Sequence, residues 1–292
     1  MSLRGQALQE FGLPAAPQRI DDLPAPAAAA GACRVHTPAG RFLLLWSGGA
    51  LAMAFEATLF DLLAESRYPA PRPQRARGGS FIARLPQPGG GPAAAACYLW
   101  PPGEETDPAA ASVPQLLEIG RLLARLHQLG ETHPASVSDS GDGPTLLARL
   151  PAGADRDALA PALEAGLPAL PTGAVHGGLR PARALFVGDR CSAVLPSGLA
   201  CSAPLVLDLA ESALGWMLAT PRPSAALRAL ISGYQSLRRL VSEELQAVFP
   251  ALRFAAAREG ARRASLGRPA ALAALHEVES LGEAEIRACT GA

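Results

Sequence analysis

The sequence predicts an α+β protein with two lobes, a small β-rich N-terminal lobe (residues 1–100) and a larger helical lobe (residues 101–292). Two observations predict this division. Strand-like segments separated by turns fill the first hundred residues, whereas apolar residues recur at helical spacing over most of the remainder. The change of pattern falls at the segment 101–103, Pro-Pro-Gly, which is the predicted hinge.

The N-terminal lobe is predicted to be a mostly antiparallel sheet with one helix. Residues 32–46 have the pattern of two strands around a turn at 38–40. Apolar residues then recur at helical spacing over 51–65, and three closely spaced prolines end that helix. A second pair of strands, 80–84 and 94–100, is joined by the turn-rich sequence PQPGGGP.

The C-terminal lobe is predicted to be helical around one inserted hairpin. Residues 113–129 carry an amphipathic stripe, and the polar stretch 134–155 is predicted to be a surface loop that leads to short helices. The segment 174–197 has the pattern of a loop followed by two strands, with Gly188 and Asp189 in the turn. Residues beyond Ala203 are helical in character, with expected proline breaks at 221–223, 250 and 269.

Composition excludes several classes of function. The chain has 26 basic and 26 acidic residues and a pI near 7.0, which argues against attraction to nucleic acid or to an anionic membrane. All the basic residues are arginines, so an enzyme that depends on a lysine Schiff base is excluded. A Walker-type phosphate loop is excluded as well, because it needs a lysine after its glycines.

The sequence also indicates a reduced, cytoplasmic setting. The N-terminus has no apolar run typical of a signal peptide, and no apolar stretch approaches the roughly 20 residues of a membrane span. Neither a zinc site nor a disulfide framework is indicated, because the cysteines are odd in number and none stand in CxxC spacing. They are Cys33, Cys97, Cys191, Cys201 and Cys289.

One segment resembles a known catalytic loop. Val175-His176-Gly177-Gly178-Leu179, continued by Ala184-Leu185-Phe186, is similar to the pattern H-G-D-L-x-x-x-N-[VI]-L-F of aminoglycoside-phosphotransferase-type kinases. Within that superfamily the best match is to homoserine kinases of the protein-kinase-like type. Supporting stretches follow in order over about 220 residues, namely 40–44, 120–127, 207–210 with Trp216, 233–238, 243–245 and 252–254. The resemblance implies a two-lobed protein-kinase-like fold and an ATP-dependent phosphotransfer ancestry.

Three positions that carry the chemistry of the family hold other residues in this chain. The catalytic Asp, which accepts the proton of the attacking hydroxyl, corresponds to Gly178. The two magnesium-binding positions correspond to Arg183 and Pro196. A proline side chain offers no oxygen ligand, and an arginine repels a divalent cation. We therefore expect no catalytic residue, no metal site and no cofactor.

The nucleotide-binding positions implied by the resemblance differ too. The loop near the phosphates corresponds to residues 25–31, Ala-Pro-Ala-Ala-Ala-Ala-Gly, which retain one glycine for close approach of the backbone to phosphate. The strand position that holds a lysine in many relatives lies near Leu45. Its helical partner corresponds to Glu56, which would have no lysine to pair with.

Residues that hold the loop together are retained. By resemblance, His176 and Gly177 shape the loop, Asp208 ties its backbone to the following helix, and Trp216 is a core residue. His127 ends an amphipathic stripe and is predicted to be a half-buried packing residue.

Candidate ligand-binding residues are His176, Arg180 and Arg183. The two arginines are three residues apart in a loop that faces the cleft in relatives, and paired guanidiniums bind phosphate well. The alternatives are a structural histidine and a solvated pair of arginines. Asp189 is interpreted as a turn residue and Glu211 as a surface or capping carboxylate. We interpret three further arginines as part of a solvated helix face or as a patch that binds a partner, namely Arg258, Arg262 and Arg263.

Two hypotheses for function follow. The first is a pseudokinase that binds a metabolite or anion in the interlobe cleft, or a protein partner. The second is an active kinase for homoserine or a similar hydroxyl substrate, with ATP and magnesium, in which Asp189, Asp208 or Glu211 replaces the missing carboxylates.

Overall fold

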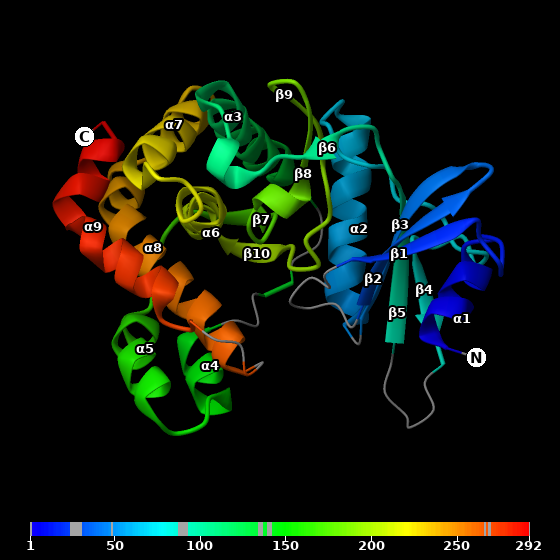
Figure 1. Cartoon of the computed structure of the whole chain (residues 1–292), viewed down its shortest axis with the longest axis horizontal. Coiled ribbons are helices and arrows are strands. Elements are labelled where there is room, and N and C mark those ends of the chain that lie inside the picture. Colours follow the sequence, from blue (N-terminus) through cyan, green and yellow to red (C-terminus); the bar gives the residue numbers. More distant parts are fainter. Residues whose placement is uncertain are drawn as a thin grey trace.

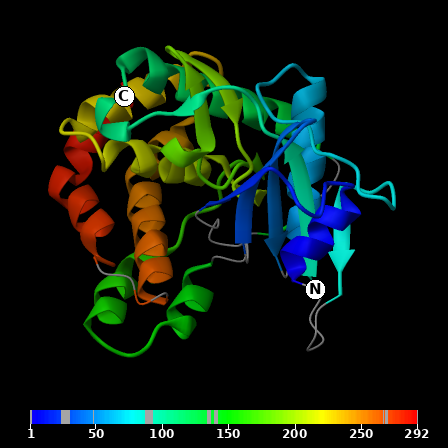
Figure 2. The same ribbon diagram turned by 45° about the vertical axis from the view of Figure 1, so that its right-hand side comes forward.

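The computed structural model describes residues 2–23, 31–47, 49–86, 93–133, 137–138, 142–265, 267 and 270–291. An antiparallel sheet forms the N-terminal part and helices dominate the C-terminal part, which confirms the predicted α+β fold (Figure 1). In the view of Figure 2, turned by 45°, the sheet and the helical part again lie side by side.

The N-terminal sheet has five described antiparallel strands in the order β1-β2-β3-β5-β4. Alternation along the strands gives each face its own core: Leu43 and Leu45 lie in one apolar cluster, and Leu44 between them lies in another. Helix α2 (Ala50–Glu65) covers the first face and α1 (Leu3–Glu10) the second. The strands are β1 (Arg19–Leu23), β2 (Gly31–Thr37), β3 (Gly40–Ser47), β4 (Ile82–Leu85) and β5 (Ala93–Leu99).

Short strands form the centre of the molecule beyond the hinge. They pair as β6 with β8 with β9, and as β7 with β10, all antiparallel. Between β7 and β8 lies the loop that contains Gly177 and Gly178, which we call the catalytic-type loop (His176–Arg183). The strands are β6 (Glu104–Glu105), β7 (Thr172–Val175), β8 (Ala184–Val187), β9 (Arg190–Val194) and β10 (Cys201–Pro204).

Seven described α-helices surround these strands, and the pairs α3 with α7 and α6 with α8 pack closely. Helix α3 begins with a capping box in which Ser112 and Gln115 satisfy each other's backbone N–H groups. The helices are α3 (Val113–Gly130), α4 (Gly143–Arg149), α5 (Ala154–Ala165), α6 (Leu205–Met217), α7 (Pro223–Gln235), α8 (Ser242–Ser265) and α9 (Ala273–Cys289).

Most elements agree with the sequence prediction, and one break does not. The strand–turn–strand over 32–46, the helix over 51–65 and the hairpin turn at Gly188 are confirmed. The predicted break at Pro250 is wrong, because α8 continues through it. Residues on both sides of this proline pack against the rest of the helical lobe, and that burial outweighs the loss of one hydrogen bond.

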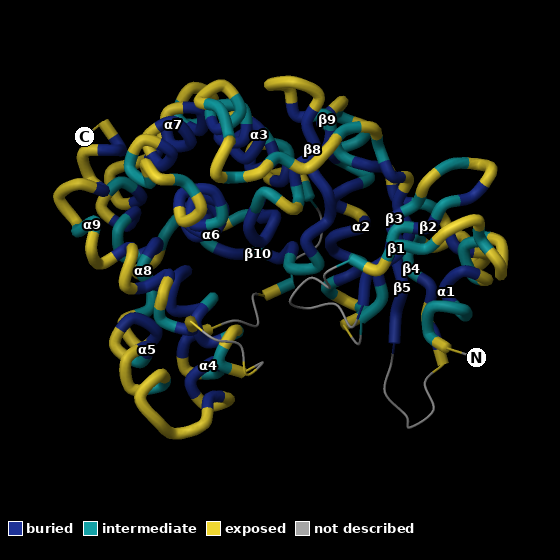
Figure 3. Tube along the Cα trace, in the orientation of Figure 1, coloured by how far each residue is buried: buried dark blue, intermediate teal, exposed yellow. Residues whose placement is uncertain are grey.

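One apolar core runs through both parts of the molecule. A single cluster of buried side chains includes Leu43 and Phe60 from the sheet side together with Val194, Trp216 and Leu252 from the helical part. Buried segments are accordingly continuous from the sheet to the outer helices (Figure 3). The division at residue 100 stays a prediction.

The part of the chain that the structure describes contains neither a disulfide bond nor a membrane-spanning helix. No disulfide joins the five cysteines, all of which are described and buried. Among the described residues, no helix is both long enough and apolar enough to cross a membrane.

Candidate functional site

Asp208, in the first turn of α6, holds the backbone of the catalytic-type loop. Its Oδ1 accepts hydrogen bonds from the N–H groups of Gly177 (2.9 Å) and Gly178 (2.7 Å), and its Oδ2 accepts one from the N–H of His176 (2.8 Å). The carboxylate is almost fully buried. The predicted structural roles of Asp208 and Gly177 therefore agree with the geometry.

Two buried side chains, His127 and Tyr234, extend the hydrogen-bond network of Asp208. The imidazole Nε2 of His127 lies 3.0 Å from Asp208 Oδ2, and its Nδ1 lies 2.8 Å from the hydroxyl of Tyr234. Burial by itself raises the pKa of Asp208. The hydrogen bonds and the neighbouring histidines lower the pKa by more than burial raises it, so it lies below its usual value. His127 was expected to be a half-buried packing residue; it is instead fully buried and hydrogen-bonded.

His176 lies within the fold rather than at a ligand site. Its side chain is fully buried, and its Nε2 lies 2.9 Å from the carbonyl oxygen of Leu195. Burial lowers the pKa of the imidazole below 6.5. This position fits the structural interpretation of His176 and gives it no exposed surface with which to contact a ligand.

Arg180 fills the space beside Gly178. A Cβ atom at Gly178 would lie 3.3 Å from Arg180 Nε, and the Gly178 φ of +96° is one that residues with side chains rarely adopt. Gly215 of α6 makes room for the arginine, since a Cβ there would lie 2.9 Å from Arg180 Cγ. The guanidinium then pairs with Glu259 of α8 at 2.9 Å. Arg180 thus lies beside the position that, by resemblance, corresponds to the family's catalytic Asp.

Glu56 of α2 binds the loop after β9 in place of a lysine. Its Oε1 accepts hydrogen bonds from the N–H groups of Ser197 (2.9 Å) and Gly198 (2.8 Å) and from the Ser197 hydroxyl (3.2 Å). Leu45, near the expected lysine position, is buried in the apolar cluster that α2 covers. Burial raises the pKa of Glu56. Pro196 directly precedes these donors.

Arg183 lies in the catalytic-type loop and is partly buried. Its guanidinium makes no hydrogen bond or ion pair with a residue that the structure describes, and the charges of Glu56 and Glu105 act on it. Burial lowers the pKa of Arg183 despite those carboxylates. Because Arg180 is already paired with Glu259, an anion bound by both arginines would share the Arg180 guanidinium with that carboxylate.

The residues at the family's metal positions do not fit magnesium. Arg183 presents a cation and Pro196 presents no side-chain oxygen, whereas magnesium needs carboxylate or amide oxygens. Within the described ranges no group of three or more histidine, cysteine, aspartate or glutamate side chains could hold a metal ion.

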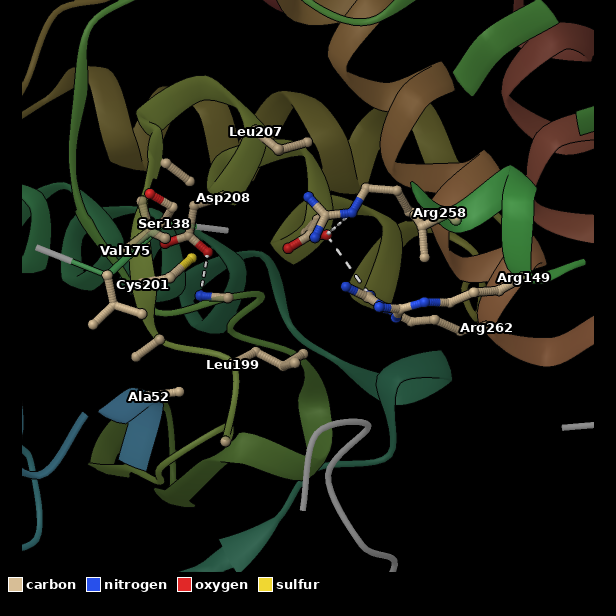
Figure 4. Close-up of a pocket in the computed structure, with 17 residues that line it drawn as sticks. Ala52, Ser138, Arg149, Val175, Leu199, Cys201, Leu207, Asp208, Arg258 and Arg262 are labelled. Carbon is tan, nitrogen blue, oxygen red and sulfur yellow. Dashed lines mark hydrogen bonds and ion pairs between the residues drawn. The ribbon is translucent and has the colours of Figure 1, made fainter. Parts of the chain in front are cut away.

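A cavity of about 260 Å³ opens beside the catalytic-type loop, and charged side chains line one side of it (Figure 4). Arg258 and Arg262 of α8 and Arg149 at the end of α4 lie on that side. Glu211 of α6 lies between the two α8 arginines, with Oε1 3.6 Å from Arg258 Nε and 3.8 Å from Arg262 Nη1. Apolar side chains and loop backbone form much of the rest: Ala52, Val137, Leu146, Val175, Gly177, Gly198, Leu199, Ala200, Cys201, Ala203 and Leu207.

The sequence interpretation of these charged residues was wrong. Glu211 was expected at the surface or as a cap, and Arg258 and Arg262 on a solvated face, but the side chains of Glu211 and Arg258 are only 5% exposed and that of Arg262 17%. Two signals were present. Arg258 and Arg262 are four residues apart and share a helix face, and Glu211 follows Asp208 by three residues.

The other sequence-predicted residues lie apart from the cavity or outside the described chain. Asp189 accepts a hydrogen bond from Ser112 Oγ (2.6 Å) at the start of α3, which fits its role in the turn. Residues 24–30, which include most of the loop expected near the phosphates, lie outside the described residues. Gly31 is described, and a Cβ there would overlap the Trp46 indole.

The fold and the site define a two-lobed, kinase-like protein whose catalytic-type loop is held by a buried aspartate. Residues 29–246 match the phosphotransferase enzyme family that includes the aminoglycoside phosphotransferases. The chain belongs to this family.

Curated relatives give a closer comparison. The chain is 34% identical over 237 residues to a homoserine kinase of Afipia carboxidovorans, covering 75% of this chain and 70% of that one. It is 31% identical over 232 residues to a homoserine kinase of Rhodopseudomonas palustris, covering 73% and 69%.

Solved structures show the same fold at low identity. An amicoumacin kinase in complex with AMP-PNP superposes with a TM-score of 0.74 at 13% identity, covering 94% of this chain and 90% of that one. A microcompartment-associated aminopropanol kinase gives a TM-score of 0.69 at 17% identity, covering 98% and 95%. Both are small-molecule kinases by name, and they establish the fold of this chain.

Proposed function

We propose that this chain is a pseudokinase of the phosphotransferase family, which binds a small molecule beside the catalytic-type loop and does not transfer phosphate to it. The observation that carries this proposal is the placement of Arg180. It crowds the position of the family's catalytic carboxylate at Gly178, is accommodated by Gly215, and is held by Glu259. Arg180, Gly215 and Glu259 thus fit together beside Gly178, which supplies no carboxylate of its own.

The electrostatics of the cleft support the same proposal. Phosphoryl transfer depends on positioned carboxylates and on metal ions that neutralise developing charge. Gly178, Arg183 and Pro196 supply neither, and Arg183 adds positive charge where a divalent cation would have to lie.

The alternative, an active kinase for homoserine or a similar hydroxyl substrate, would need a replacement carboxylate. Asp189 is bound to Ser112, and both oxygens of Asp208 accept backbone hydrogen bonds. Glu211 lines the cavity, but two guanidiniums lie within 4 Å of it and oppose a role as a metal ligand. The feature that favours this alternative is the position of Glu211, whose Cβ lies 3.5 Å from the place that a Cβ at Gly178 would occupy.

The rest of the proposal concerns setting and partners. We propose a cytoplasmic protein without a cofactor; ATP and magnesium would be required only if the alternative holds. The proposed ligand is a metabolite or anion, and a protein partner is the second candidate. Neither nucleic acid nor membrane is expected as a partner, given the formal net charge of zero.

A turnover assay tests the proposal. Purified protein is incubated with ATP, magnesium and homoserine, and product formation is compared with that of a homoserine kinase such as the Afipia relative. We expect no product above the rate without protein. Magnesium-dependent phosphorylation that tracks the purified chain would refute the proposal and support the kinase alternative.

A restored variant gives a stricter test. The triple change Gly178→Asp, Arg183→Asn and Pro196→Asp returns the three family residues, yet Arg180 would still crowd position 178 and the backbone there would be strained. We expect no activity from this variant, measured in the same assay. Circular dichroism must first show that it is folded; turnover by the folded triple variant would mean that Arg180 does not block the site.

A further inference from the structure

The charged side of the cavity is incompletely paired. Two guanidiniums share Glu211 Oε1 at 3.6 and 3.8 Å, which is beyond hydrogen-bond distance, and that oxygen has no hydrogen-bond partner among the described residues. Arg262 likewise makes no hydrogen bond to a described residue, although its side chain is mostly buried. A mostly buried charge without a hydrogen bond is costly, so a group that completes the contacts of Arg262 would be bound favourably.

The geometry points to a particular class of ligand. We propose that this cavity binds the oxyanion group of a small metabolite, a carboxylate or a phosphate, through Arg262 with support from Arg149 and Arg258. This inference rests on the proposed function, because both assign a ligand to the cavity beside the catalytic-type loop.

The charge around the cavity favours an anion. Among the described residues, Arg149, Arg258 and Arg262 line it together with two carboxylates, and one of these, Asp208, is already saturated by backbone N–H groups and His127. Of the described lining carboxylates, Glu211 is therefore the one with capacity left to compensate the guanidiniums of Arg149 and Arg262. Guanidinium groups bind planar carboxylates and phosphates through paired N–H donors.

The shape of the cavity limits the ligand. A volume of about 260 Å³ suits a small metabolite, and apolar residues such as Leu199, Val175 and Leu207 line the wall away from the arginines (Figure 4). The ligand would thus place its oxyanion against α8 and its carbon chain toward the catalytic-type loop.

Binding of simple anions tests the inference. Inorganic phosphate and acetate are titrated into the protein at constant ionic strength, with chloride as the balancing ion, and the thermal midpoint and heat of binding are measured. At a hundred times its dissociation constant, a bound anion should raise the midpoint by roughly 5 °C or more. A stronger response to phosphate identifies phosphate esters as the ligand class, and a stronger response to acetate identifies carboxylates. No response to either anion overturns the inference.

Two variants locate the site. Arg262→Gln removes the cavity guanidinium, and Arg263→Gln makes the same change one residue later, at a side chain that is 46% exposed and pairs with Glu259. We expect Arg262→Gln to weaken anion binding about tenfold or more and Arg263→Gln to change it less than about twofold. Equal effects, or binding that survives Arg262→Gln, would place the anion elsewhere and overturn the inference.

The result of the anion-binding test can be distinguished from the result of the turnover assay that tests the proposed function. Anion binding is measured without ATP or magnesium, so it does not depend on turnover. A protein that phosphorylates homoserine yet binds anions through Arg262 would refute the pseudokinase proposal alone. A protein without turnover that does not respond to anions would refute this inference alone.

Discussion

At the scale of single residues, Asp208 has the largest structural role in the candidate site. One buried carboxylate accepts three backbone hydrogen bonds from the catalytic-type loop and a fourth contact from His127. Because its pKa lies below 3.8 in the folded state, this contribution is present above pH 3.8 and is lost as the pH falls through the folded-state pKa. The loop conformation therefore depends on an ionised side chain outside the loop as well as on the glycines of its own sequence.

We predict that Asp208→Asn destabilises the protein by about 2–4 kcal/mol. The amide retains one acceptor oxygen, but its NH₂ group would face a backbone N–H that then stays buried without a partner. Chemical denaturation measures the loss. Asp189→Asn is the matched control at an exposed hydrogen bond and should cost less than about 1 kcal/mol; equal losses in the two variants would contradict the role given to Asp208.

At the scale of elements, Glu56 joins α2 to the loop that follows β9. It accepts two backbone N–H groups and one hydroxyl from that loop, so these hydrogen bonds link the helix to the loop. Leu45 lies near the position where relatives carry a lysine. The Glu56 carboxyl therefore accepts hydrogen bonds from neutral donors instead of pairing with a lysine. Burial raises the pKa of Glu56, which means that folding favours its protonated form.

Glu56→Gln tests this contact and its pH dependence. Since the folded-state pKa is raised, the folded protein binds more protons, and the wild type loses stability as the pH rises from 4.5 through the folded-state pKa. The glutamine keeps an acceptor oxygen and does not titrate. Relative to the wild type, the variant should therefore gain stability over that pH window, measured by denaturation at several pH values.

Two comparisons control the Glu56 experiment. Glu65→Gln, at an exposed position on the same helix, should leave the pH dependence of the wild type unchanged. Glu56→Ala leaves the loop donors buried without a partner and should cost about 2–4 kcal/mol at all pH values. A Glu56→Gln variant with the same pH profile as the wild type would contradict the buried, raised-pKa carboxyl.

At the scale of the whole molecule, the two lobes share their core. One apolar cluster contains residues of the sheet, of α2 and of the helical lobe, so separating the lobes would expose Phe60 and Tyr98 together with side chains of the C-terminal part. Exposure of that surface is unfavourable by about 25 cal/mol for each Å² of apolar area. The lobes are thus coupled in stability although the sequence divides them at residue 100.

We predict a single cooperative unfolding transition for the full chain. Calorimetry should give equal calorimetric and van't Hoff enthalpies, and unfolding followed by tryptophan fluorescence should coincide with that followed by circular dichroism. A fragment of residues 1–100 should be unfolded in isolation, because α2 would lose its cover. Two separate transitions, or a folded fragment, would show that the lobes are independent domains.

The fold class and the residues that hold the loop could be predicted from the amino-acid sequence. Strand alternation, helical periodicity and turn residues are local properties, so 32–46, 51–65 and 113–129 could be assigned from spacing. The family motif likewise located Asp208, because its partners lie in one short loop. The first strand and first helix of the chain were missed, since both carry weak apolar patterns and depend on the sheet for stability.

The charged character of the cavity could be recognised in the folded chain and not from local sequence patterns. Glu211 and Arg262 are about 50 residues apart, and Glu211 is a charged residue within a largely apolar helix. Their burial follows from the packing of α6 against α8, a contact that no local pattern encodes. The filling of the Gly178 site by Arg180 is of the same kind, because it depends on Gly215 and Glu259, which meet the loop only in the folded chain.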